Sequence, residues 1–561
     1  MPAQCTTVVL VRATEVRRVK TYRGVWQLQT PFCLVSRGPM DALEPSNMPT
    51  GKERESASIL VPDWLITSHV SLITCSDWLI TLQIAPIFKK GNKCRPENYR
   101  PVALTSHLIK TFERIVRTQL SDYVENSGIL NEEQHGFRAG RSCLTQLLLH
   151  YDSILESLNS GLEVDVAYID FEKAFDKVDI QVLLEKLQRY GVTGKLFKWI
   201  QAFLTGRSQT VVVEGCRSRM EAVISSVIQG SVLGPLLFII YIADLVSGTT
   251  GKLGTFADDT KIGQEIKDLS DRDSLQRDLT LIEEWSRKNN MALHEKKFQV
   301  LNYRLNSTKP LRALPFNTEC YFYFNPNGDI IEAEFGVKDL GIYLTEDGKF
   351  NFHIATIATE AKRIAGWALG VFRNRSKRTL LTLFKALVRP KLEYCSALWS
   401  PTSIGDIAKL EGVQRFYTRR IEECSGMDYW ERLKFLGIQS LQRRRERFMI
   451  IHLWKVYHGL VPNHTNRPVD DSFKVHPRRG VLAEYPDLYT AAQDSIETIR
   501  EGSFSVRSVK LFNRMPKEVR GCETLEDLKV SLGKFLDGIP DHPPVRGYRS
   551  PNDNSLVLPP G

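Results

Sequence analysis

The chain has 561 residues, of which 42% are hydrophobic and 25% are charged, and its 75 Lys and Arg against 65 Asp and Glu give a formal net charge of +10. This length exceeds what a single hydrophobic core supports, so we expect two to four domains, and the positive charge suits a polyanionic partner. No apolar run reaches the roughly 18 residues of a membrane span, the N-terminus lacks a signal-peptide core, and the ten cysteines form no C-x-x-C pair. These features argue against a membrane protein, a secreted protein and a zinc ribbon.

Residues 1–76 show no sustained hydrophobic periodicity, and we expect them to be poorly ordered. From about residue 77 to 345, short apolar runs alternate with amphipathic segments, which predicts a core of mixed α and β structure. The expected strands are VDVAYIDF (164–171) and QTVVVEG (209–215), and the expected helices are DIQVLLEKLQRYG (179–191) and KLFKWIQAFLTG (195–206).

Beyond this core, residues 355–399 keep helical spacing, and Pro390 predicts a break between two helices. The stretch LGIYLTEDGKF (340–350) has the pattern of a hairpin with a tight turn at 346–348. The chain becomes polar after residue 465, and its last 20 or so residues are rich in proline and expected to be disordered.

Two acidic elements carry the candidate chemistry. Asp170 ends a predicted strand, and Asp258 and Asp259 occupy the end of a predicted hairpin, KLGTFADDTKIGQE (252–265). If the two elements are neighbours in one antiparallel sheet, three carboxylates converge and require a cation. Mg²⁺ prefers such oxygen ligands, and a pair of ions serves nucleotidyl transfer. The alternative is a surface turn, in which adjacent aspartates are common and water screens their charges.

Eight motifs, including those of the two acidic elements, occur in a fixed order over about 340 residues: IAPIFKKGNKCRPENYRPVALTS, LNEEQHGFRAGRSCLTQL, YIDFEKAFDKVD, IQGSVLGPLLFIIYIADL, TFADDTKI, NNMALHEKKFQVL, DLGIYLTEDGKF and LVRPKLEYCSALWSP. Together they resemble the reverse transcriptase of jockey-like non-LTR (LINE-type) retrotransposons. The resemblance implies an α+β right-hand polymerase. Its parts would be fingers and palm at 77–345, a helical thumb at 346–430, a helical extension at 431–540 and a disordered tail at 541–561.

The resemblance also implies roles for individual residues. Asp170, Asp258 and Asp259 would bind two Mg²⁺ ions, with Mn²⁺ as a possible substitute, and Lys297 would act as the general acid for pyrophosphate. Phe175 would exclude a 2′-hydroxyl. The other residues implied to bind nucleotide are Lys89, Lys90, Arg100, Arg138, Gln229 and Gly230, and those implied to contact template or primer are Arg141, Gly341, Arg373 and Lys377.

The expected partners are an RNA template, a DNA primer or target and deoxynucleoside triphosphates, in a ribonucleoprotein of the nucleus and cytoplasm. Ser226 and Ile228 depart from the family pattern, which has Gly and Pro there, and Ser would strain a glycine-preferring turn. No motif of the family's N-terminal endonuclease is recognisable in residues 1–76, so we expect a truncated element. The alternative function is therefore a remnant that binds nucleic acid without polymerising.

Overall fold

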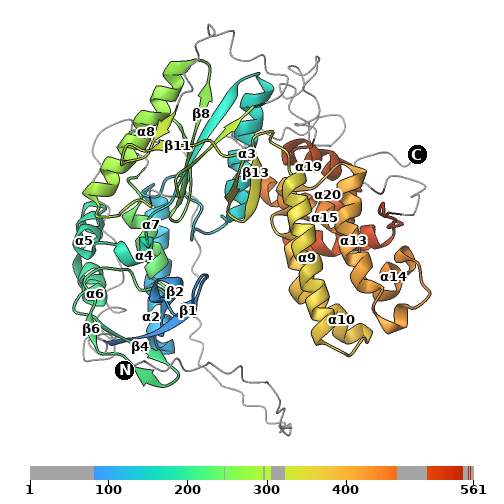
Figure 1. Cartoon of the computed structure of the whole chain (residues 1–561), viewed down its shortest axis with the longest axis horizontal. Helices are drawn as coiled ribbons and strands as arrows, with labels where there is room; N and C mark the ends of the chain where they lie inside the picture. The colour runs from blue at the N-terminus through green and yellow to red at the C-terminus, as the bar shows by residue number, and fades with distance from the viewer. Residues whose placement is uncertain are drawn as a thin grey trace, which may run out of the picture. The chain divides into compact units, whose positions relative to one another are not determined.

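The computed structural model describes residues 81–245, 247–294, 297–304, 322–463 and 502–546, together with Asn554 and Leu556 (Figure 1). The prediction of poor order for residues 1–76 lies outside the described residues. Within the described part of the chain, no helix is both long and apolar enough to cross a membrane.

A four-stranded antiparallel sheet in the order β7-β8-β3-β9 positions the acidic residues. Its strands are β3 (Glu163–Ile169), β7 (Lys252–Phe256), β8 (Asp259–Ile266) and β9 (Gln299–Tyr303). β7 and β8 form the predicted hairpin, with Phe256 paired to Asp259 across a two-residue loop. β3 lies between β8 and β9, so the predicted neighbour relationship between the two acidic elements is confirmed.

Apolar layers cover both faces of this sheet. Successive side chains of a strand point to opposite faces, and Val166 and Tyr168 accordingly belong to one hydrophobic cluster while Ala167 and Ile169 belong to another. Helix α3 (Cys143–Asn159) contacts β3 and β7, and α8 (Leu269–Lys288) contacts β8. Because both faces are buried, β3 is an almost continuous apolar run and its C-terminal end is fixed in position.

A second sheet and several helices complete the N-terminal half. The sheet contains β1 (Thr81–Phe88), β2 (Tyr99–Ala103), β4 (Ser208–Val213), β5 (Cys216–Arg217) and β6 (Glu221–Ala222). The helices are α2 (His107–Asn126), α4 (Ala174–Lys177), α5 (Ile180–Arg189), α6 (Gly194–Leu204) and α7 (Gly234–Tyr241), with a 3-10 turn η1 at Pro96–Asn98. The two strands and two helices expected from the sequence between residues 164 and 215 are thus all present.

The hairpin expected around residues 340–350 has a different turn from the one predicted. β12 (Gly336–Asp339) pairs with β13 (Ile342–Thr345), so the chain reverses at Leu340 and Gly341, and both residues have positive φ. The predicted tight turn at 346–348 is present, with the Gly348 N–H donating to the carbonyl of Thr345 at 3.0 Å, but it leads into helix α9 (Asn351–Val371), so the prediction that it closes the hairpin was wrong. A short hairpin of β10 (Tyr323–Phe324) and β11 (Ile330–Ile331) precedes this region.

The C-terminal half is helical (Figure 1). After α9 come α10 (Lys377–Leu383), a π-helical turn η4 (Phe384–Val388), α11 (Arg389–Glu393), α12 (Ser396–Trp399), α13 (Ile404–Thr418), η5 (Glu422–Cys424), α14 (Tyr429–Leu436), α15 (Leu441–Tyr457), α19 (Phe504–Asn513), α20 (Lys517–Arg520) and α21 (Leu525–Asp537). Pro390 lies in the first turn of α11 just after the π-helical turn, and residues 377–393 are helical without interruption, so the predicted break between two helices was wrong and the helix changes type instead. Residues of α9, α13, α15, α19 and α21 share one hydrophobic cluster, and residue 430 falls within α14. The predicted domain boundaries remain predictions.

The tail predicted to be disordered makes contacts where the structure describes it. Asn554 is only 7% exposed, and its side chain accepts a hydrogen bond from the backbone N–H of His542 at 2.8 Å. The backbone N–H of Leu556 donates to Glu446 of α15 at 3.3 Å. The expectation of disorder is therefore corrected for these residues, and most of residues 547–561 lie outside the described part.

Candidate active site

The structure brings the three predicted carboxylates to one edge of the central sheet. Ile169 pairs with Thr260, so Asp170, which follows β3, lies next to Asp259 at the start of β8. Asp258 occupies the loop of the β7–β8 hairpin. Asp170 and Asp259 both line a cavity of about 490 Å³. Antiparallel pairing explains this convergence, because the end of β3 and the beginning of β8 face the same edge.

Mutual repulsion marks these carboxylates as a group. Burial, followed by repulsion from Asp258, Asp170 and Asp339, raises the pKa of Asp259 to about 6. Burial and repulsion from Asp170 raise the pKa of Asp258 as well. A bound cation would relieve this repulsion, and carboxylate oxygens are ligands that hard divalent ions prefer.

Lys297 lies beside this group. Its Nζ forms an ion pair with Oδ2 of Asp170, and it lines the same cavity. Among the described residues, no set of three or more His, Cys, Asp and Glu side chains is arranged so that it could hold a metal ion. The donor chemistry of the carboxylates fits a divalent cation, and Lys297 contacts only Oδ2 of Asp170.

Two of the basic residues implied to bind nucleotide, Lys89 and Arg100, lie within electrostatic reach of the carboxylates. Lys89 follows β1 and Arg100 lies on β2, where it pairs with Ile87, and both side chains are exposed. Their charges lower the pKa of Asp258 in opposition to burial, which places them within electrostatic reach of the carboxylate group. Lys90 is exposed beside Lys89.

Phe175 lies in α4, shortly after Asp170. Its ring stacks on Phe238 at a centroid distance of 4.5 Å and meets Phe137 edge-on at 6.0 Å. The side chain is half-buried, so one part packs in the core while another remains accessible. These contacts hold the ring in one orientation.

The segment before α7 has two unusual backbone positions. Gly230 has a φ of +103°, and a Cβ at this position would lie 2.5 Å from the carbonyl oxygen of Ala103, so only glycine fits. Gln229 donates from Nε2 to Asp176 at 3.4 Å. Ser226 has a φ of +102°, which confirms the prediction that serine occupies a glycine-preferring turn.

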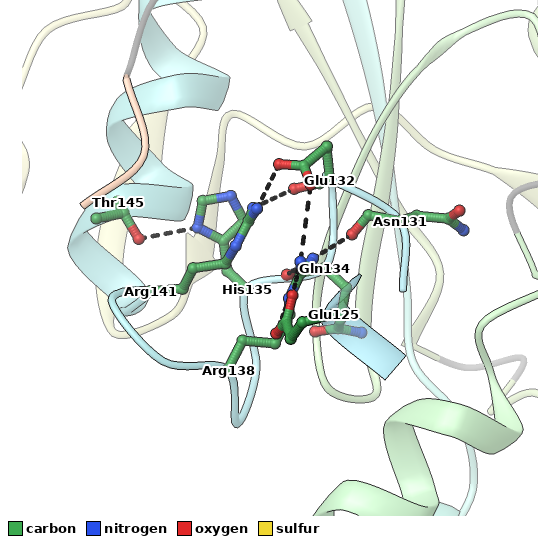
Figure 2. Close-up of polar contacts among 8 residues, drawn as sticks. All are labelled: Glu125, Asn131, Glu132, Gln134, His135, Arg138, Arg141 and Thr145. Carbon is green, nitrogen blue, oxygen red and sulfur yellow. Dashed lines mark hydrogen bonds and ion pairs between the residues drawn. The ribbon is translucent and has the colours of Figure 1, made fainter. Parts of the chain in front are cut away.

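Arg138 and Arg141 line a different cavity, of about 880 Å³. Figure 2 shows the polar contacts around them. The Arg138 side chain is 4% exposed and donates from Nε to Glu125 at 2.9 Å. Arg141 forms an ion pair with Glu132. The guanidinium of Arg138 is thus buried and paired with Glu125, and its role in nucleotide binding stays a prediction.

The remaining predicted contacts to template or primer are spread over the chain. Gly341, at the turn between β12 and β13, lines the cavity of Asp170 and Asp259. Arg373 is exposed between α9 and α10 and lines neither of the two cavities. Lys377 donates from Nζ to the carbonyl of Phe435 at 2.9 Å and lies over its ring.

Sequence reasoning missed Lys261, which lies on β8 two residues after Asp259. This lysine of β8 is 3% exposed, forms an ion pair with Asp339 of β12 and donates to Oε1 of Gln146 in α3 at 2.8 Å. It therefore connects the carboxylate hairpin to the β12–β13 hairpin and to α3. A lysine inside the apolar part of a predicted strand was the available signal, since buried lysines are rare without a partner.

Sequence reasoning also missed Gln134. Its side chain binds the backbone of Ala257, which lies between Phe256 and Asp258. The two residues are 123 positions apart in the chain, so nothing in the local sequence indicates the contact.

Residues 87–332 match the family described as reverse transcriptase (RNA-dependent DNA polymerase). This segment belongs to the reverse transcriptase family. The resemblance stated from the motifs is therefore confirmed, and so is the α+β class of the polymerase domain.

The reverse transcriptase domain of this chain has relatives among transposon proteins. The chain is 28% identical over 351 residues to the probable RNA-directed DNA polymerase from transposon X-element of Drosophila melanogaster, covering 61% of this chain and 37% of the relative. It is 27% identical over 399 residues to the RNA-directed DNA polymerase from mobile element jockey of Drosophila funebris, covering 69% and 42%. The chain thus spans about two fifths of the length of these relatives.

Among solved structures, the chain is similar to a telomerase. The apo telomerase from Candida tropicalis superposes with a TM-score of 0.36 and 11% sequence identity, covering 65% of this chain and 62% of the telomerase.

Proposed function

We propose that this chain is an RNA-directed DNA polymerase of a non-LTR retrotransposon, which adds deoxynucleotides to a primer 3′-hydroxyl on an RNA template. The observation that carries the proposal is the convergence of Asp170, Asp258 and Asp259 at one sheet edge inside a reverse transcriptase domain. The raised pKa values of Asp258 and Asp259 support it, because perturbed carboxylates gathered at one site are typical of catalytic sites.

The three carboxylates would hold two Mg²⁺ ions, for which Mn²⁺ could substitute. When bound, such ions supply charge stabilisation for the attacking and leaving oxygens of an in-line displacement. In this reaction the primer 3′-hydroxyl loses its proton to solvent and its oxygen forms a bond to the α-phosphorus, the bond from that phosphorus to the bridging oxygen breaks, and pyrophosphate leaves.

The side chains around the carboxylates would bind and select the nucleotide. Lys89 and Arg100 lie within reach of Asp258 and would attract the triphosphate, Arg100 with a planar fork and Lys89 as a mobile charge. The Phe175 ring, held by its stack on Phe238, would collide with a ribose 2′-hydroxyl. Lys297, once released from Asp170, would donate a proton to departing pyrophosphate.

Primer extension tests this proposal. The purified chain is given oligo(dT) annealed to poly(rA), dTTP and Mg²⁺, and we expect the primer to lengthen. Asp258→Asn should abolish extension because it removes one of the three carboxylate charges. Asp122→Asn is the matched control, since Asp122 is exposed on α2 outside the cavity, and this variant should extend normally.

The alternative, a remnant that binds nucleic acid without polymerising, is favoured by the positive φ of Ser226. A folded parent that binds the primer duplex without extending it would support the remnant. Ser226→Gly separates the two cases further, because glycine adopts this conformation without a penalty of roughly 1–2 kcal/mol. Extension that appears only in Ser226→Gly would identify an enzyme impaired at this turn.

A further inference from the structure

The loop of the carboxylate hairpin consists of Ala257 and Asp258, which we call the tip. Ala257 has a φ of +56°, in the left-handed region that favours glycine. A strained residue of this kind persists only where its surroundings hold it in place. The neighbours of Ala257 therefore determine whether the tip keeps its shape.

The side-chain amide of Gln134 contacts both polar backbone groups of Ala257. Its Oε1 accepts the backbone N–H of Ala257 at 2.8 Å, and its Nε2 donates to the carbonyl of the same residue at 3.4 Å. The same Oε1 accepts the N–H of Gly136 at 2.7 Å. Gln134 is only 4% exposed, so little water competes for these groups.

The segment that carries Gln134 is bound along the outer edge of β7. Gln134 forms a parallel bridge with Thr255, His135 donates its N–H to the carbonyl of Thr255 at 3.0 Å, and Thr255 donates to the carbonyl of Glu133 at 3.1 Å. Gly136 permits the close approach to the tip, because a Cβ there would lie 2.3 Å from the backbone nitrogen of Ala257. β3 pairs with the β8 arm of the hairpin on one side, and this segment binds the β7 arm on the other.

Arg138 supports the segment in turn (Figure 2). Its Nη1 donates to the carbonyl oxygens of Asn131 at 2.5 Å and of Gln134 at 3.2 Å, while its Nε donates to Glu125 at the end of α2. The backbone of Gln134 is thus fixed by a buried arginine, which lowers the entropy lost when the amide binds the tip. Both the position and the orientation of the amide are set before any substrate arrives.

We propose that Gln134 is a positioning residue: its amide holds Ala257 in the left-handed conformation and thereby directs Asp258 and Asp259 toward the cavity that Asp170 lines. The inference rests on the proposed polymerase function. Misplacement of reacting groups by about 1 Å can reduce a rate by roughly 10²-fold, so a loosened tip should affect turnover more than substrate binding.

Hydrogen exchange tests the contact without turnover. Gln134→Met keeps a similar side-chain volume but removes both hydrogen bonds to Ala257, and we expect the Ala257 amide to exchange at least about tenfold faster. Gln188→Met is the matched control, because Gln188 is exposed on α5, and this variant should leave the Ala257 amide unchanged. Unchanged exchange of that amide in a folded Gln134→Met variant would overturn the proposal, whether or not the parent extends primers.

Kinetics test the consequence in a parent that extends primers. Gln134→Met should lower kcat by about 10- to 100-fold while KM for dTTP changes less than about threefold. In an Ala257→Gly background the same substitution should cost at least about tenfold less, because glycine takes a positive φ without help. A loss of equal size in both backgrounds, or a change confined to KM, would overturn the positioning role and leave the polymerase assignment intact. Failure of the parent itself to extend would instead contradict the polymerase assignment.

Discussion

A single methyl group at Gly136 should abolish most of the proposed primer extension without unfolding the protein. A Cβ at this position would lie 2.3 Å from the backbone nitrogen of Ala257, whereas ordinary van der Waals contacts begin at 3.4 Å. The φ of Gly136 is not positive, so alanine is compatible with the backbone and the effect comes from contact alone. The contacted atom is backbone, so the tip or the 133–136 segment must move by about 1 Å, and we expect kcat to fall by roughly 10²-fold.

The assay is steady-state primer extension on poly(rA), with circular dichroism and thermal unfolding to verify the fold. Gly263→Ala is the matched control from β8 of the same hairpin, where a Cβ would meet Val166 at an ordinary 3.4 Å. This control should keep activity within about threefold. If Gly136→Ala extends primers as fast as the parent, then the 133–136 segment does not constrain the carboxylates and the reasoning fails.

Three further predictions concern the residues around the carboxylates. Lys261→Met should destabilise the protein by about 3–5 kcal/mol in urea unfolding, because it leaves Asp339 buried and unpaired. The double variant Lys261→Met with Asp339→Leu should recover most of that loss. An equal loss of stability in both variants would contradict the ion-pair explanation. Asp259→Asn should raise the midpoint of thermal unfolding at neutral pH in the presence of a chelator. The pKa of the Asp259 carboxyl is raised from 3.8 to about 6, so this group lowers folded stability as the pH rises through that range. The stability gained by the variant should vanish near pH 3.8, and it should be small because the Asp259 side chain is exposed to solvent. Phe175→Ala should reduce discrimination against ribonucleotides by roughly 10- to 200-fold in competition assays, and unchanged sugar selectivity would exclude Phe175 as the steric barrier.

The sequence by itself determined the elements that carry the carboxylates. The apolar run before Asp170 predicted β3, and the alternating residues around Asp258 and Asp259 predicted the β7–β8 hairpin. These features are local, because strand and turn preferences depend on neighbouring residues. The ordered motifs added the family, which the match over residues 87–332 confirms.

Sequence patterns failed where a turn or a charge depends on distant contacts. The reversal at Leu340 and Gly341 was missed because the glycine of the next turn, Gly348, gave an equally good local signal. Arg138 was assigned to nucleotide because a guanidinium suits phosphate, and only the fold shows that its guanidinium is paired with Glu125. An arginine has the same local appearance in both situations.

Only the tertiary structure decided how the carboxylates are held in place. Gln134 reaches Ala257 across 123 positions, and Lys261 reaches Asp339 across 78. Such contacts form because packing places polar groups beside each other in a region with little water, where each must find a partner. The sequence therefore specified which residues bear the charge, and the packing of segments distant in the chain fixed where that charge points.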